Sequence, residues 1–169
     1  MTIGIDMMGG DYAPLEAVKG IRDYLASHPA PASLLLIGDQ SAITTLLEQE
    51  QVPRDLLTIR HAEQVIGMHE HPTRALREKQ QSSIAIGFQL LAQGQISAFI
   101  SAGNTGAMLV GTLFSIKALE GVIRPSISTI VPKLNGGSGL LLDVGLNADC
   151  KPEQLNQFAA DHQLGENWR

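Results

Sequence analysis

Acidic residues and glycines gather directly after the first apolar run of the chain. Asp6 and Asp11 flank Gly9 and Gly10, and Pro14 then favours the start of a helix. Glycine lets a ligand approach the backbone closely, and the two carboxylates are suited to bind a metal or to orient a base. The alternative is a tight strand-to-helix turn in which Asp11 caps the helix.

A second small-residue segment, SAGNTG at residues 101–106, also follows an apolar run and opens a helix. Free backbone N–H groups at a helix start, without bulky side chains around them, favour a bound anion such as phosphate. Asn104 and Thr105 add side-chain hydrogen-bonding groups. The segment lacks the Gly-Lys-Ser/Thr ending of a Walker loop and does not match GxGxxG. The alternative is a capped helix start without a ligand.

Basic residues lead into a further helix start. Arg74, Arg77 and Lys79 precede Ser82 and Ser83 in the chain. Positive side chains beside a helix N-terminus strengthen an anion site, so this segment is a second candidate for phosphate binding. The alternative is a basic turn that faces solvent.

The fourth candidate is the pair Asp143 and Asn147, which again follows an apolar run. Asp143 is suited to hold a lysine or to accept a reacting proton. Asn147 is suited to donate a hydrogen bond to a developing oxyanion. The alternative is a turn followed by the cap of the last helix.

These segments need a scaffold, and short apolar runs alternate with amphipathic stretches along the whole chain. Strands are expected at residues 3–7, 34–37, 57–60, 98–101, 127–131 and 140–143. Helices are expected at residues 14–26, after Ser41 as a cap, at 83–93, at 104–119 and from Pro152 onward. The alternation predicts an α/β protein with a parallel or mixed sheet, helices on both faces, one domain and no linker. Ligands of such sheets bind at the carboxyl ends of the strands, where the first, second and fourth candidate segments lie.

Two glycine positions predict local geometry. Asn135-Gly136-Gly137 is typical of a hairpin turn between the last two strands, because glycine accepts a positive φ. Gly94 lies where a helix that ends near residue 93 needs a residue of positive φ.

The composition excludes several classes of protein. The 169 residues are 44% apolar and 17% charged, which provides a core and excludes wholesale disorder. Lysine and arginine number 12 against 17 acidic residues, a net charge of −5 that argues against a general nucleic-acid binder. The N-terminus lacks the basic region of a signal peptide, and no apolar run approaches the ~20 residues that span a bilayer. We therefore expect a cytoplasmic protein, with peripheral membrane contact left open.

Two weaker features argue against other chemistry. His69 and His71 flank Glu70, but residues in a loop without a further ligand nearby rarely bind a metal. The single cysteine, Cys150, allows no internal disulfide and has no histidine at a motif spacing, so it is not expected to be a nucleophile. The sequence offers no sign of a metal or an organic cofactor.

Five stretches, taken in order, resemble one family: the bacterial phosphate acyltransferases of phospholipid synthesis, or acyl-acyl-carrier-protein:phosphate acyltransferases. These stretches are IGIDMMGGDYAP at 3–14, ALREKQQSS at 75–83, FISAGNTGA at 99–107, RPSI at 124–127 and LLLDVGLNADCKPEQLNQFA at 140–159. The resemblance implies transfer of a fatty acyl group from acyl carrier protein to inorganic phosphate, which yields acyl phosphate. It also implies a three-layer α/β/α sandwich similar to phosphotransacetylases and isocitrate dehydrogenases, and a homodimer.

Phosphate is itself the nucleophile in this reaction, so the site needs phosphate ligands, a positioned thioester and donors for the oxyanion. The candidate catalytic residues are Asp6, Asp11, Lys79, Asn104, Asp143 and Asn147. The candidate substrate-binding residues are Gly9, Gly10, Ser82, Ser83, Ser101, Gly103, Thr105, Gly106 and Arg124. These roles are expectations from side-chain chemistry, and the resemblance alone does not assign them.

The resemblance also sets the expected limits of the chain. Family members are much longer, so residues 1–159 are interpreted as the N-terminal part of the acyltransferase domain. Residues 160–169 are interpreted as a divergent tail, and Leu146 stands where the family usually has alanine. This leaves open whether the chain is active alone or is a non-catalytic remnant that binds phosphate or carrier protein. A related phosphotransferase that uses coenzyme A is a third, less favoured reading.

The expected partners follow from the implied reaction. Acyl carrier protein is acidic, so its docking patch should be basic, and Arg74, Arg77, Lys79 and Arg124 are candidates. Acyl phosphate is the substrate of a membrane glycerol-3-phosphate acyltransferase in the family's pathway, which makes that enzyme a further expected partner.

Overall fold

The computed structural model describes residues 1–118, 122, 125–145, 147 and 149–165. Contacts within the chain divide it into two compact units, Met1–Lys117 and Ala118–Arg169. The sequence had predicted a single domain without a linker, and this division was not anticipated. Each unit is described by itself.

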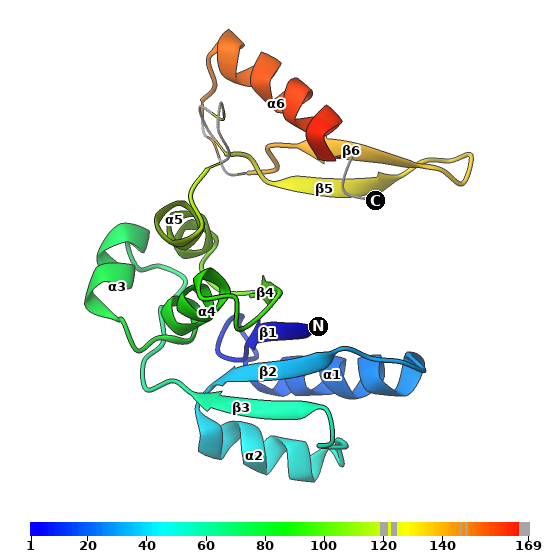
Figure 1. The fold of residues 1–169 in the computed structure, drawn as a ribbon, viewed down its shortest axis with the longest axis vertical. Coiled ribbons are helices and arrows are strands. Elements are labelled where there is room, and N and C mark those ends of the chain that lie inside the picture. The colour runs from blue at the N-terminus through cyan, green and yellow to red at the C-terminus, as the bar shows by residue number, and fades with distance from the viewer. Residues whose placement is uncertain (119–121, 123–124, 146, 148, 166–169) are drawn as a thin grey trace. The chain divides into compact units, whose positions relative to one another are not determined.

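The first unit is built on a parallel sheet of four strands in the order β3-β2-β1-β4 (Figure 1). Its strands are β1 (Thr2–Asp6), β2 (Ser33–Gly38), β3 (Leu57–His61) and β4 (Ala98–Ile100). The register pairs Ile5 with Leu36 of β2 on one side and with Ile100 of β4 on the other. The central strand β1 thus joins the two halves of the sheet.

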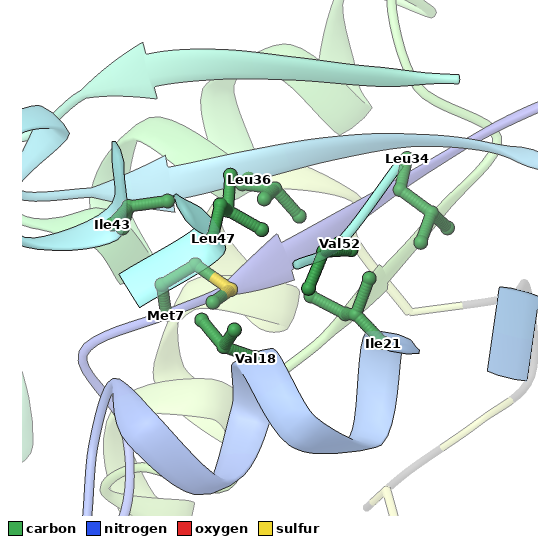
Figure 2. Packing of buried hydrophobic residues seen from close by; sticks show 8 residues of the cluster. All are labelled: Met7, Val18, Ile21, Leu34, Leu36, Ile43, Leu47 and Val52. Carbon is green, nitrogen blue, oxygen red and sulfur yellow. The ribbon is translucent and has the colours of Figure 1, made fainter. Parts of the chain in front are cut away.

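Helices α1 (Leu15–Ser27) and α2 (Gln40–Gln49) cover one face of this sheet. Figure 2 shows their apolar side chains converging with those of β2 and with Met7, which directly follows β1, on a common core. Its buried members are Met7, Val18, Ile21, Leu34, Leu36, Ile43, Leu47 and Val52. Burying apolar surface of this kind is the main force that holds the helices on the sheet.

Helices α3 (Pro72–Glu78), α4 (Ser83–Ala92) and α5 (Thr105–Ser115) form the layer on the other side. Because side chains alternate along a strand, Leu34 and Leu36 face α1 and α2, whereas Leu35 and Ile37 pack in a cluster with Ile86 of α4. A third cluster joins α3, α4 and α5 through residues such as Ala75, Phe88 and Ala107. The unit is therefore a three-layer α/β/α arrangement with a parallel sheet, as expected.

The second unit contains the antiparallel pair β5 (Ser128–Pro132) and β6 (Ser138–Leu142), followed by α6 (Pro152–Gly165). The expected hairpin turn is confirmed, since Gly136 has a φ of +83° between the two strands. These strands form a sheet of their own and do not extend the parallel sheet of the first unit.

Several boundaries correct the sequence expectations. Ser41 is not the cap of α2: the carboxylate of Asp39 accepts the hydrogen bond from the Ala42 N–H, 2.9 Å away. Helix α3 was not expected at all, because it is short and has few apolar positions. Helix α5 ends at Ser115, earlier than the expected residue 119, which itself lies outside the described residues. The positive φ of Gly94, +69°, is confirmed.

Candidate functional site

The order of the strands marks one edge of the sheet as the place for a ligand. From β1 the chain proceeds through α1 to β2 on one side, and it returns through α4 to β4 on the other side of β1. The strand order therefore reverses between β1 and β4. Open α/β sheets bind ligands at the carboxyl ends of the strands beside such a reversal. The segments after β1 and β4 are two of the four predicted candidates.

Asp6, the last residue of β1, connects these two segments through a chain of hydrogen bonds. Its Oδ1 accepts from the Met8 N–H at 2.9 Å, and its Oδ2 accepts from the Ser101 hydroxyl at 2.7 Å. The Ser101 Oγ in turn accepts from the Gly103 N–H at 2.9 Å. Asp6 is only 4% exposed, and through these hydrogen bonds its buried carboxylate stabilises both loops.

The two loops approach so closely that only glycine fits between them. A Cβ atom on Gly9 would lie 2.5 Å from the backbone nitrogen of Gly103 and 2.8 Å from Asp6 Oδ2. Gly10 has a φ of +100°, which is strained for residues with a side chain. The sequence predicted close backbone approach at these glycines, and the partner of Gly9 is the second loop itself.

Asp11 and Thr105 are polar residues of the two loops that are exposed to solvent. The alternative that Asp11 caps α1 is wrong, because Pro14 occupies the cap position and no side chain accepts a hydrogen bond there. Thr105 is the first residue of α5, where the backbone N–H groups of the first turn have no partner within the helix.

The side-chain amide of Asn104, which was expected to donate to an oxyanion, is bound to backbone groups of the protein. It caps α5, with Oδ1 accepting from the Ala107 N–H at 3.0 Å. Its Nδ2 donates to the backbone oxygens of Gly67 and Glu70, both at 3.1 Å, and to that of Met68 at 3.3 Å. Both ends of this buried amide are therefore used to fix the loop. Gly106 is equally confined, since a Cβ there would lie 2.4 Å from Pro72.

The polar groups of the basic segment before α4 are likewise bound by other groups of the protein or buried. The Lys79 ammonium donates to the Glu70 carboxylate at 2.5 Å and to the Val65 carbonyl at 2.7 Å. The hydrogen bond from Lys79, with another from the Gly67 N–H, lowers the pKa of Glu70. Ser82 caps α4 and is 0% exposed, and Ser83 is 1% exposed. Ser82 and Ser83 are therefore buried, and the ammonium group of the partly exposed Lys79 is bound by two groups of the protein itself.

Asp143 and Asn147 lie in the second unit and bind each other. The Asn147 Nδ2 donates to Asp143 Oδ1 at 2.7 Å and to the Pro125 carbonyl at 3.3 Å. The Cys150 thiol donates to Asp143 Oδ2 at 3.4 Å. Asp143 adopts a φ of +56°, so these contacts stabilise a tight turn after β6. Arg124, also predicted to bind substrate, lies outside the described residues.

Beside the first two loops the structure has a cavity of about 540 Å³ that the sequence did not reveal. It lies between α1 and the β1–β4 pair, and its lining includes Asp6, Gly9, Gly10 and Ser101 of the two loops. The remaining lining is predominantly apolar. Its residues are Ile3, Ile5, Asp11, Tyr12, Ala13, Glu16, Ala17, Gly20, Ile21, Tyr24, Leu34, Ile100 and Ala102. Gly20, in the middle of the expected helix, was the sequence feature that could have indicated open space beside that helix.

Within the described part of the chain no group of three or more histidine, cysteine, aspartate or glutamate side chains is arranged to hold a metal. None of the described helices is long and apolar enough to cross a membrane.

The fold defines a doubly wound α/β protein. Loops rich in small residues follow β1 and β4 at the carboxyl edge of its sheet, and a mostly apolar cavity lies beside them. Residues 1–167 match the model of the family described as "Fatty acid synthesis protein", so the chain belongs to that family.

Relatives with the printed name phosphate acyltransferase support this assignment. Those of Desulforamulus reducens and Dictyoglomus turgidum are 44% and 42% identical over 159 residues, 94% of this chain but 46% and 47% of their own lengths. That of Halothermothrix orenii is 43% identical over 164 residues, 97% of this chain and 48% of the relative. The chain thus spans about half the length of the curated relatives it matches.

Proposed function

We propose that this chain takes part in phosphate acyltransferase chemistry, with acyl-acyl carrier protein and inorganic phosphate as substrates. The observation that carries the proposal is its similarity to phosphate acyltransferases at 42–44% identity across 94% of its length. The arrangement at the carboxyl edge of β1 and β4 supports it, because the start of α5 lies there and a helix start offers N–H donors to an anion.

The chemistry requires one displacement at the thioester carbon. A phosphate oxygen forms a bond to the acyl carbon, and the bond from that carbon to the carrier's sulfur breaks. The carrier leaves as a thiolate, which takes up a proton to become a free thiol. The protein must hold phosphate beside the thioester and stabilise the oxyanion between these two steps.

We assign the phosphate site to the two loops of the first unit. Gly9, Gly10 and the start of α5 supply the close backbone approach, and the Thr105 hydroxyl adds a donor. Asp11 is the exposed carboxylate that takes the proton of a dihydrogen phosphate. Asp6, Ser101 and Gly103 position the loops through their hydrogen bonds.

The other predicted residues receive positioning roles in this proposal. Asn104, Lys79, Ser82 and Ser83 stabilise the loops and helix starts around the site, because their polar groups are bound or buried. Asp143 and Asn147 remain candidates for the thioester side of the reaction. Residues 1–159 then contribute the N-terminal part of the acyltransferase domain, and residues 160–169 a divergent tail.

Carrier protein, location and assembly complete the proposal. The exposed Arg74 and Arg77 of α3 are proposed to attract the acidic carrier protein. The enzyme is proposed to act as a cytoplasmic homodimer, in peripheral contact with the membrane. There it would pass acyl phosphate to a glycerol-3-phosphate acyltransferase.

The test is phosphate-dependent release of free carrier-protein thiol from acyl carrier protein, measured for this chain. Thr105→Val is expected to raise the KM for phosphate about tenfold, because one hydrogen bond to a charged ligand is lost. The matched control is Thr112→Val on the same helix, whose hydroxyl donates to the Met108 carbonyl away from the loops. The control is expected to leave the KM unchanged.

If this chain releases no thiol, a binding measurement distinguishes the proposed function from the alternative of a non-catalytic remnant. Binding of inorganic phosphate is then measured by calorimetry for the chain and for Thr105→Val. Binding that depends on Thr105 without turnover identifies a non-catalytic phosphate binder. Absence of both turnover and phosphate binding overturns the assignment of the loops.

A further inference from the structure

The walls of the cavity beside the loops are predominantly apolar, and its polar lining includes Asp6, Asp11, Glu16 and Ser101. Its walls include Ile3, Ile5 and Ile100 from the sheet and Ala17 and Ile21 from α1. Its polar end is formed by the Asp6 and Ser101 side chains with the two glycines of the first loop. At about 540 Å³ it falls in the range of small-molecule sites, which are mostly apolar with a few polar groups.

The direction of the chain gives this cavity a long axis. Strand β1 ends at Asp6, and α1 then runs back along the sheet toward the start of β2. Ile5 and Ile3 therefore lie progressively farther from the loops. The helix residues Ala17, Ile21 and Tyr24 follow the same direction. The apolar lining thus leads away from the proposed phosphate site, beneath α1.

Gly20 keeps this passage open. It lies in the interior of α1, where glycine destabilises a helix relative to alanine. No turn or close packing requires it, because a Cβ at this position would meet no atom within 4 Å. Gly20 is exposed to solvent and lines the cavity, so a large side chain at this position would narrow the cavity along α1.

We propose that this cavity binds the acyl chain of the thioester, with the thioester carbonyl at the end formed by Asp6 and Ser101. The proposal rests on the proposed function, since it names where the fatty chain of that substrate lies. A flexible hydrocarbon chain matches the apolar walls, and the polar end lies where phosphate would attack.

Saturated fatty acids of 6 to 16 carbons are suitable probes, with binding measured by displacement of a fluorescent fatty acid. Affinity should rise about fourfold per methylene until the chain fills the cavity, and then level off. Gly20→Leu should move that plateau to shorter chains and weaken binding of the longest acids about tenfold or more. Ala26→Leu, an exposed position on the same helix outside the lining, should leave the profile unchanged.

A second variant keeps the test valid if Gly20→Leu fails to fold. Ile100 lies on the opposite wall and is 54% exposed, so Ile100→Asn should fold and weaken binding of long chains more than of short ones. Equal binding of all chain lengths, insensitive to both substitutions, would indicate an apolar face that packs against protein and would overturn the proposal.

The outcome is separable from that of the proposed function. Fatty-acid binding that depends on Gly20, without phosphate-dependent thiol release, refutes the function and retains the cavity. Thiol release whose chain-length preference is unaffected by Gly20→Leu retains the function and refutes the cavity.

Discussion

Two helix glycines on opposite faces of the same sheet have opposite surroundings. Gly87 of α4 packs directly on β4, where a Cβ would lie 2.2 Å from the ring of Phe99. Gly20 of α1 borders the cavity, where a Cβ would meet nothing within 4 Å. The same residue type thus serves close packing on one side and leaves open space on the other. We call these the closed face and the open face.

The difference separates a tightly packed layer from a layer that leaves space. On the closed face, α4 also packs against α5 so tightly that a Cβ on Gly111 would lie 2.3 Å from Phe88. On the open face, α1 covers β1 and β2 but leaves a space toward β4. Interiors packed to this density do not tolerate added volume, whereas a space does.

The largest expected effect is on the closed face. Gly87→Ala should destabilise the protein by about 2 kcal/mol, because the new methyl group displaces the Phe99 ring in a packed layer. Urea unfolding followed by circular dichroism measures the change. In a Phe99→Leu background the same substitution should cost much less, since the ring is absent. Equal costs in both backgrounds would show that Phe99 is not what confines Gly87.

The edge where the two faces meet should show an intermediate effect. Ser101→Ala removes the hydroxyl between Asp6 and Gly103, which leaves a buried carboxylate oxygen and an N–H without this partner. We expect a loss of about 1.5 kcal/mol by urea unfolding. Ser33→Ala, at an exposed strand position, is the matched control and should change stability by no more than about 0.5 kcal/mol. A loss no larger than that of the control would exclude a structural role for this link.

The open face should respond in the opposite direction. Gly20→Ala should stabilise the chain by about 0.5–1 kcal/mol, because alanine is the better helix former and its methyl group meets no atom. Thermal unfolding of the two proteins without ligand provides the measurement. A destabilised variant would mean that the space beside Gly20 is filled in solution, and the contrast between the two faces would fail.

The sequence predicted the elements of both faces well but could not predict their contrast. Alternating apolar runs identified the strands and the longer helices, and Asp6 and Ser101 were recognised at strand ends. Their hydrogen bond joins residues 95 positions apart, so it depends on β4 lying beside β1, which local patterns do not specify. For the same reason the packing of Gly87 and the space beside Gly20 were not foreseeable.

The basic segment shows why the remaining site predictions changed. Lys79 and Ser82 have the side chains of a phosphate site, and their spacing before a helix is suitable. The Lys79 ammonium group is bound by the carboxylate of Glu70, nine residues earlier in the chain. The Ser82 hydroxyl oxygen accepts a hydrogen bond from the backbone at the start of α4. The local sequence could not predict this contact, because it depends on the turn and the unexpected helix α3 that bring Glu70 to Lys79.

The smallest expected effect concerns this same ion pair, which ties the segment before α3 to the end of that helix. The hydrogen bonds from Lys79 and the Gly67 N–H lower the pKa of Glu70 below its ordinary value. The folded state therefore favours the charged form. The resulting stability is fully present above the ordinary glutamate pKa of about 4.5 and is lost as the pH falls through the lowered value.

Glu70→Gln should consequently lower stability at neutral pH and flatten the loss of stability as the pH falls below the ordinary glutamate pKa. The effect should be modest, because the pair is partly exposed to solvent. Urea unfolding at several pH values measures it for the wild type, Glu70→Gln, Lys79→Met and the double variant. The double variant should show no further change in pH dependence beyond Glu70→Gln, since the carboxylate is already gone. Parallel curves for the wild type and Glu70→Gln would instead mean that the Lys79 contact adds nothing to the closed face in solution.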